Sequence, residues 1–150
     1  MSGNATVVIG TSTWECSLAQ SITELTSGLS GVASIPTSTG VLFDMGLAYS
    51  EIQINTDDML FSIDIVYMDE DGVVLAVSED VAPGDVEAYN GVEGARYFME
   101  INAGEATDVD VGDEAAITIA AAGSVLDILY TALPAMILVM MMGVAAKSMR

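Results

Sequence analysis

Charge is divided so unevenly along this chain that its two ends require different surroundings. Of its 150 residues, 22 are Asp or Glu and 3 are Lys or Arg, which gives a net charge of -19. All but one of the acids lie in residues 1–116, and the only base in that part of the chain is Arg96. The segment 128–146 carries no charge. An acidic body that needs water is therefore joined to an apolar tail that needs to be buried.

The tail has the length and composition of a hydrophobic α-helix. Its 19 uncharged residues approach the roughly 20 that cross the hydrocarbon core of a bilayer. A helix that is apolar on all sides is equally suited to burial against copies of itself. We therefore expect either a transmembrane helix or an assembly helix, with a lipid bilayer or neighbouring copies in a homo-oligomer as its partner. The residues assigned to this helix include Ile128, Leu133, Pro134, Ile137 and Met140.

The composition divides the chain into an acidic domain at 1–119, a hinge at 120–127, the hydrophobic helix at 128–146 and a basic tip at 147–150. The first residues lack a basic region followed by an apolar one, so no cleaved signal peptide is expected. The basic tip predicts a cytoplasmic C-terminus, which would place the acidic domain on the outer side of the membrane. A tail anchor without a signal peptide would instead keep this domain in the cytosol. These two indications of topology conflict. The expected location is a membrane, or a virion or cell-surface particle.

Several classes of chemistry are excluded by composition. Three basic residues cannot form the patch that neutralises phosphates, so the chain is not expected to bind nucleic acid. It contains no His, which removes imidazole bases, imidazole metal ligands and nucleophile pairs that depend on imidazole. Its single cysteine, Cys16, adjoins Glu15 and no base, so nothing in the local sequence activates the thiol. We expect no enzyme activity, no catalytic residue, no metal site and no cofactor.

The body is predicted to be mainly β, as a compact antiparallel sandwich or barrel with one or two peripheral helices. Leu18, Ile22, Leu25 and Leu29 recur at helical spacing and predict a helix over 14–27 that ends at Gly28. Strands are predicted at 6–9, 41–43, 51–55, 73–77, 96–101 and 115–119, and a long buried strand is predicted at 59–68. Between two of the apolar runs, Asp71-Gly72 predicts a hairpin turn whose two central residues both favour positive φ.

Three segments of the body resemble a known family. They are SIDIVYMDEDGVV at 62–74, GARYFMEINAG at 94–104 and VGD at 111–113. In this order and spacing they are similar to the motifs of the bacterial and archaeal domain of unknown function 192, also called uncharacterised protein family 0127. The resemblance covers residues 6–119 and implies a mainly β, sandwich-like fold, to which this chain adds a C-terminal hydrophobic helix. It implies no activity.

The chain departs from the family pattern at one stretch. The family's Phe-Trp-Met-Lys-Asn-Thr falls here on residues 54–59, without its Trp, Lys and Asn. The family's proline before the Asp-Ile strand is Ser62, and the first Pro of its Ala-Arg-Tyr motif is Gly94. If the aromatic stretch forms a pocket in relatives, we expect this chain to have lost it.

Few individual residues indicate a site. Asp57, Asp58 and Asp64, or Asp69 to Asp71, offer several carboxylates for calcium, but neither group has the spacing of a calcium loop, so solvated turns are expected. Arg96 is expected to form a structural ion pair, with Glu100 as the assigned partner and Asp64 or Asp113 as alternatives. A ligand pocket, if present, is expected where aromatic side chains converge, around Trp14, Tyr67, Tyr89 and Tyr97.

Two functions are consistent with these features. The first is a non-enzymatic structural module, in which an acidic β domain is displayed in many copies on a membrane or particle, viral or cell-surface, by its C-terminal helix. The strong negative charge keeps such copies soluble and apart. The second is a membrane-anchored binding domain for a small ligand or glycan. A pocket with converging aromatic and polar side chains distinguishes the second from the first.

Overall fold

A computed structural model describes residues 1–121, apart from the side chains of residues 50, 51, 53, 86–91 and 121. Within this range the protein is mainly β, as predicted, with one short helix. The elements are β1 (Gly3–Ile9), β2 (Ser12–Ala19), α1 (Ile22–Ser27), β3 (Thr39–Asn55), β4 (Ile63–Met68), β5 (Val74–Val81), β6 (Val86–Asn102) and β7 (Ala115–Ala121). The predicted hinge residues from 122 on, the hydrophobic helix and the basic tip lie outside the described residues. Among residues 1–121, no helix is long and apolar enough to cross a bilayer.

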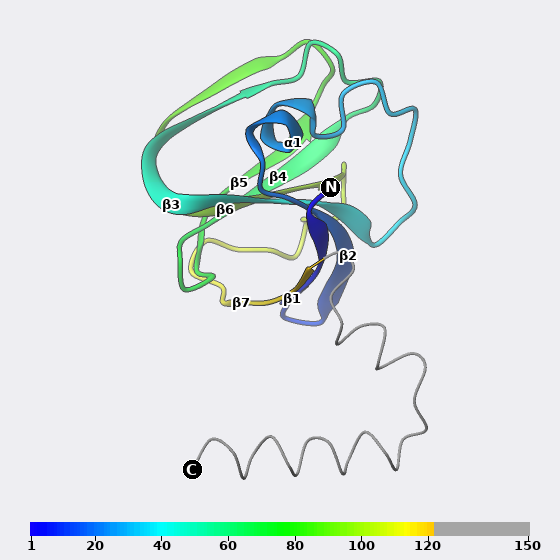
Figure 1. Ribbon diagram of the computed structural model, residues 1–150. Coiled ribbons are helices and arrows are strands. Elements are labelled where there is room, and N and C mark those ends of the chain that lie inside the picture. The colour runs from blue at the N-terminus through cyan, green and yellow to red at the C-terminus, as the bar shows by residue number, and fades with distance from the viewer. Residues whose placement is uncertain (122–150) are drawn as a thin grey trace, which may run out of the picture.

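The seven described strands form one curled sheet in the order β5-β4-β6-β3-β2-β1-β7 (Figure 1). Its two ends approach each other, because Val73 at the start of β5 forms an isolated bridge with Glu114 before β7. The backbone N–H of Val74 donates to the carbonyl of Asp113 over 2.8 Å, and that of Ala115 donates to Gly72 over 2.8 Å. These contacts partly close the sheet into a barrel-like shape and reduce its exposed edges.

The expectation of an entirely antiparallel sheet is wrong for one pair of strands. β2 and β3 are parallel, with Cys16 opposite Gly40 and Leu18 opposite Leu42. Parallel neighbours need a crossover connection, and the chain makes one with residues 20–38, which contain α1. Figure 1 shows α1 lying in the curve of the long β3–β6 pair. The crossover therefore covers one face of the sheet and forms the wall of the candidate site.

The predicted helix over 14–27 is also wrong in its first half. Residues 12–19 form β2, which pairs with β1 through a tight turn at Gly10 and Thr11. Trp14, Cys16 and Leu18 alternate with more exposed residues, so their spacing of two, not the helical spacing, describes the segment. The helix begins only after Ser21, which caps it.

α1 is stabilised at its N-terminus by a reciprocal cap. The Ser21 hydroxyl accepts from the Glu24 N–H, and the Glu24 carboxylate accepts from the Ser21 N–H over 3.1 Å. The same carboxylate accepts from the Ser2 hydroxyl and contacts the amino group of Met1. Hydrogen bonds, first of all that from Ser2, lower the pKa of Glu24. These bonds attach a helix that buries none of its own residues to the start of the chain.

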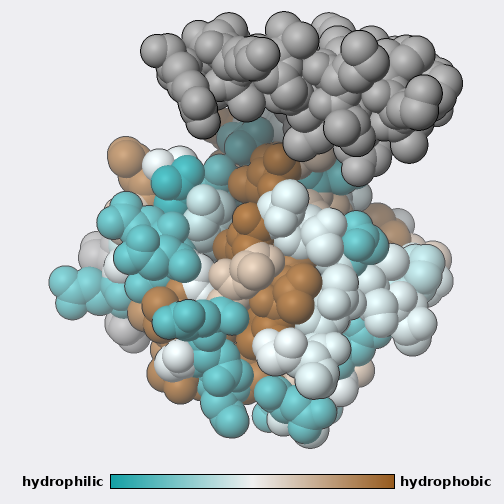
Figure 2. All heavy atoms as spheres, turned by 90° about the horizontal axis from the view of Figure 1, so that it is seen from below, coloured by the Kyte–Doolittle hydropathy of each residue, from teal (hydrophilic) through white to brown (hydrophobic). Residues whose placement is uncertain are grey.

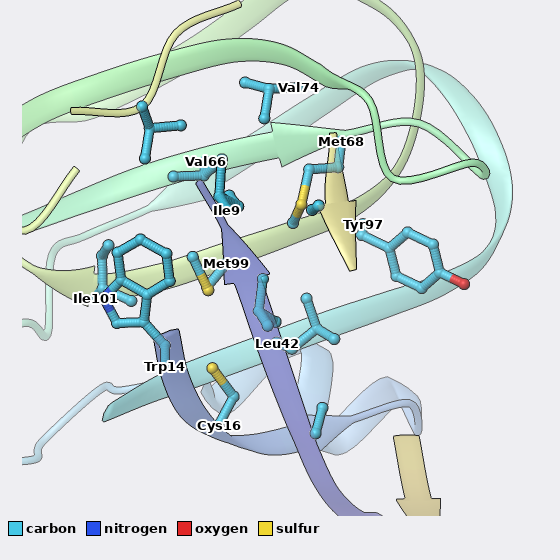
Figure 3. Close-up of a cluster of buried hydrophobic side chains, with 14 of the residues drawn as sticks. Ile9, Trp14, Cys16, Leu42, Val66, Met68, Val74, Tyr97, Met99 and Ile101 are labelled. Atoms are coloured by element: carbon cyan, nitrogen blue, oxygen red, sulfur yellow. The ribbon is translucent and has the colours of Figure 1, made fainter. Parts of the chain in front are cut away.

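Hydrophobic side chains form a cluster on each face of the sheet. One contains Val7, Trp14, Leu42 and Met99, and Figure 3 shows Trp14 and Cys16 of β2 lying beside Met99 and Ile101 of β6. The second lies under the crossover. β4 is buried along its entire length, as expected for a strand covered on both faces. On the surface, Figure 2 shows a band of hydrophobic side chains between polar ones.

The Asp71-Gly72 turn joins β4 to β5. Of its residues only Gly72 has a positive φ, at 85°, so the prediction that both central residues adopt positive φ is wrong for Asp71. The turn is a three-residue loop with Gly72 in the left-handed position. The Asp69 side chain accepts from the N–H groups of Asp71 and Val73 over 2.9 and 2.8 Å. A Cβ on Gly72 would lie 2.5 Å from the Ala115 carbonyl oxygen. Glycine is therefore required here both by φ and by the approach of the segment that leads into β7.

Candidate functional site

Two buried carboxylates, Asp64 on β4 and Glu100 on β6, lie in contrasting environments. Asp64 is fully buried and accepts three backbone hydrogen bonds of 2.9 Å each, from Asp80, Gly104 and Ala106. Such bonds to a charged acceptor are strong. They connect β4 to the end of β5 and to the turn after β6, so Asp64 has a structural role.

Glu100 is only 5% exposed but is far less well satisfied. The backbone N–H of Leu29 donates to its carboxyl group. Its Oε2 atom has no hydrogen-bond partner among the described residues. Burial raises the pKa of Glu100 to about 7, against the smaller lowering effect of the Leu29 N–H. An unsatisfied oxygen on a buried acid is costly, and it makes Glu100 the candidate functional group.

A cavity of about 310 Å³ lies beside Glu100. Its walls come from the end of α1 and the segment after it, from β3 and β6, and from Met59. The Phe43 and Phe98 rings line it and stack in parallel, with centroids 4.2 Å apart and planes 8° apart. The other lining residues are Leu25, Thr26, Ser27, Gly28, Leu29, Ser30, Ile54 and Asn55. The cavity thus combines an aromatic and aliphatic lining with hydroxyl groups and one acid.

Gly28 controls the space next to this acid. A Cβ at this position would lie 3.2 Å from Glu100 Oε2 and 2.9 Å from the Phe43 ring. The residue also has a φ of 45°, which favours glycine. The Gly28 backbone therefore packs closely against Oε2 and the Phe43 ring, and a side chain at this position would collide with both. Gly28 and Leu29 also line a second, more open cavity of about 590 Å³ toward β2 and the start of the chain.

The predicted ion pair between Arg96 and Glu100 is wrong, so the charge of Glu100 is not balanced by Arg96. Arg96 Nε lies 3.2 Å from Asp44 Oδ1, and the guanidinium lies over the Tyr97 ring at 5.0 Å from its centroid. Burial by itself would raise the pKa of Asp44, but hydrogen bonds from Arg96, the Gly46 N–H and Gln20 together lower it. Asp44 was not considered as a partner from the sequence. It reaches Arg96 because β3 pairs with β6 and changes register just after Asp44.

The expected aromatic pocket is not formed by the side chains that the structure describes. Trp14 and Tyr97 belong to one hydrophobic cluster, and Tyr67 belongs to the other. The side chain of Tyr89 lies outside the described part. Trp14 Nε1 donates to Glu105 Oε2 over 2.9 Å, so its role is structural. The cavity that does form was not predicted, although Ile54, Asn55 and Met59, which line it, belong to the stretch from which the sequence had predicted loss of a pocket.

Other candidate groups are placed as follows. Asp57 and Asp58 are exposed, and the Asp69 side chain is engaged with the backbone of its own turn. Within residues 1–121, no group of three or more Asp, Glu, Cys or His side chains could hold a metal ion. Cys16 is buried, and burial, followed by the charge of Glu15, raises the pKa of its thiol to about 12. A thiol with this pKa is almost wholly protonated near neutral pH and is therefore a poor nucleophile.

Comparisons with known proteins agree on the family and the fold. The model of family DUF192, described as Uncharacterized ACR, matches residues 5–119. A crystal structure of a protein of unknown function from Novosphingobium aromaticivorans DSM 12444 is similar, with a TM-score of 0.68 and 20% identity over 75% of this chain and 83% of that one. So is a structure from Sinorhizobium meliloti 1021, described as a proposed transcription regulator, with a TM-score of 0.68 and 19% identity over 76% and 92% of the two chains. No curated protein matches the sequence. At these identities the solved structures support the fold alone.

Proposed function

The chain belongs to the DUF192 family, and we propose that its acidic β domain is a non-enzymatic binding module that takes up a small ligand in the Glu100 cavity. The observation that carries this proposal is a buried acid with an unsatisfied oxygen beside a cavity of about 310 Å³. Ligand sites in proteins are commonly cavities of about 300–1,000 Å³ with a largely apolar lining and few polar groups. The volume lies at the lower end of this range and therefore suits a small molecule.

The described groups favour binding over catalysis. Glu100 has no second ionisable group beside it on the cavity wall, so a general acid and a general base are not brought together there. The single thiol of the chain, Cys16, is deactivated by burial. The stacked Phe43 and Phe98 rings are largely buried and contribute, with aliphatic side chains, to an apolar part of the cavity wall against which a small apolar group can pack. Binding uses both the acid and the apolar wall, whereas catalysis would need a second reactive group beside the acid.

In this proposal the apolar segment 128–146 holds the binding domain at a membrane or within an assembly of copies. Support for a tether comes from the composition, since 19 uncharged residues follow an acidic body. The structural module without a ligand, displayed in copies on a membrane or a viral or cell-surface particle, is the competing function. It is favoured by the strongly acidic composition of residues 1–116, which keeps neighbouring copies apart.

Binding can be tested with toluene as an apolar probe and methionine methyl NMR as the readout. The full chain, labelled with ¹³C at its methionine methyl groups, is placed in nanodiscs of neutral phosphatidylcholine and titrated. Met59 lines the cavity, and Met68 lies in the cluster on the other face of the sheet. We expect a saturable shift of the Met59 methyl signal with little change at Met68. If Met59 does not respond to any small probe, the structural module is the better description.

The tether can be tested by fractionation of the full chain and of a version that ends at Ala120. If the full chain alone stays with lipid after an alkaline carbonate wash, segment 128–146 is a membrane anchor. If it alone sediments as a lipid-free particle, the segment is an assembly helix. Equal behaviour of the two versions would contradict both forms of the tether.

A further inference from the structure

Given that the cavity binds a ligand, as proposed above, we propose that this ligand is a small organic cation, an amine whose ammonium group pairs with Glu100 Oε2 and whose apolar part packs against Phe43 and Phe98. The inference rests on the proposed function and adds the chemical class of the ligand. It follows from three properties of the cavity wall: the sign of its charge, its supply of hydrogen-bond acceptors and its aromatic surface.

The cavity wall can carry only negative charge. Among the residues that line it, Glu100 is the sole ionisable one. The only basic side chain in the described part of the chain is that of Arg96, and it is engaged with Asp44; the amino group of Met1 contacts Glu24. An anionic ligand would therefore meet a carboxyl group without any base to balance it, and desolvation of such an unpaired charge is expensive. A cation supplies the charge that the site lacks.

Several polar groups on the wall can accept hydrogen bonds. Thr26 Oγ1 donates to the carbonyls of Ile22 and Thr23, at 3.0 Å each, and Ser27 Oγ donates to the Thr23 carbonyl over 2.8 Å. Both hydroxyl protons are thus used within α1, while their oxygen lone pairs stay available. Glu100 Oε2 is a further acceptor without a partner. An ammonium group has three donors and no acceptor, which complements this set.

The residues around Oε2 suit an amine with an apolar body. Gly28 packs against Oε2, where a Cβ would lie at 3.2 Å, so no side chain from this position stands between the acid and the cavity. The Phe43 and Phe98 rings lie in the same cavity and attract both apolar groups and cations. A cavity of ~150 Å³ lined by apolar side chains is sufficient for benzene. The volume of about 310 Å³ therefore accommodates a single ring with a short aminoalkyl group.

Ion pairing in this site would be linked to proton release. In the empty site burial holds the pKa of Glu100 at about 7, so roughly half of the molecules carry a neutral acid at that pH. A bound ammonium group favours the carboxylate and lowers this pKa. Affinity for a cation should therefore increase from pH 6 to pH 8, whereas affinity for a neutral probe of the same shape should not. No other ionisable side chain lines the cavity, so this dependence is assigned to Glu100.

The test compares benzylamine with toluene, which has the same ring but no charge. Both are titrated into the full chain in phosphatidylcholine nanodiscs at moderate salt, with the Met59 methyl signal as the site-specific readout. At pH 8 we expect benzylamine to bind at least tenfold more tightly than toluene, and we expect this advantage to shrink several-fold at pH 6. Glu100→Gln should remove the advantage, and Glu79→Gln, which neutralises an exposed carboxylate outside the cavity lining, should retain it.

The outcomes separate the two proposals. If toluene binds at Met59 as tightly as benzylamine at pH 8, the cavity is a site for neutral molecules, so the binding function stands and the cation inference fails. If neither probe shifts Met59, both fail. Benzylamine binding that is insensitive to pH would overturn the inference even if Glu100→Gln did not fold, because this measurement uses the unmodified protein.

Discussion

Neutralising Glu100 should change how the stability of the fold depends on pH. Burial raises the pKa of this carboxyl group from 4.5 to about 7, so the folded protein binds a proton more readily than the unfolded chain does. Between these two values the folded state holds more protons, and stability must fall as the pH rises. The difference of about 2.5 in pKa, at ~1.4 kcal/mol per unit, corresponds to a loss of ~3 kcal/mol. Above about pH 7 the loss levels off.

In the variant Glu100→Gln the new side chain has the shape of glutamate and retains an oxygen that can accept from the Leu29 N–H. It has no charge to desolvate. The variant can be less stable than the wild type at pH 4, because its amide N–H₂ needs partners in the cavity. This offset does not depend on pH. We therefore expect the free energy of unfolding of the variant, relative to the wild type, to increase by ~3 kcal/mol between pH 4 and pH 8.

The measurement is urea unfolding from pH 4 to pH 8, followed by the fluorescence of Trp14, the only tryptophan of the chain and one that is buried in the core. Glu79→Gln serves as the matched control, since it removes the charge of an exposed carboxylate, and its curve should run parallel to that of the wild type. Parallel curves for the wild type and Glu100→Gln would refute the reasoning, because Glu100 would then be as well solvated in the fold as in the unfolded chain.

Three further outcomes follow from groups described above. Asp64→Asn replaces one acceptor oxygen with a donor, so at least one of the three hydrogen bonds that Asp64 accepts from backbone N–H groups is lost. The free energy of unfolding, measured in the same urea titrations, should therefore fall by ~2 kcal/mol or more. The control Asp108→Asn, at an exposed site, should change it by less than ~0.5 kcal/mol. Cys16, whose thiol pKa is raised to about 12, should resist Ellman's reagent at pH 8 in the folded protein and react in urea, and rapid labelling without urea would contradict its burial. Residues 1–116 carry 21 acids against one base, so the midpoint of thermal unfolding should rise between about 0.05 and 1 M KCl as repulsion is screened; an unchanged midpoint would mean that repulsion does not limit stability.

The mainly β character of the domain could be predicted from the sequence, because apolar and β-branched runs separated by turn residues are a local signal. The segment around β2 shows where this signal becomes ambiguous. Leu18, Ile22 and Leu25 have helical spacing, while Trp14, Cys16 and Leu18 have the spacing of a strand. Pairing with β1 decides in favour of the strand. The start of the helix is marked in the sequence by Ser21 and Glu24, which form a reciprocal cap in the structure.

The candidate site was harder to predict, since its chemistry depends on contacts between distant segments. Glu100 was assigned to Arg96 because the two are close in sequence and opposite in charge. In the structure Arg96 contacts Asp44 from the neighbouring strand, and Leu29 and Gly28 cover Glu100 from the crossover. Neither the contact between Arg96 and Asp44 nor the covering of Glu100 by the crossover leaves a periodic pattern in the sequence. A weak indication was available in RYFMEI, where an acid lies in a strand with apolar residues on both alternating faces.

The pairing of the first strand with the last has a consequence for how the domain is made. β1 lies between β2 and β7, with Ala5 opposite both Cys16 and Ile119. On the ribosome the β1–β2 hairpin can form early, but its outer edge has no neighbour until nearly the whole domain has emerged. Contacts between residues so far apart in the chain form slowly, because a long loop must close first. During synthesis the nascent chain therefore exposes an unpaired strand edge, which is the period in which we expect it to depend most on chaperones.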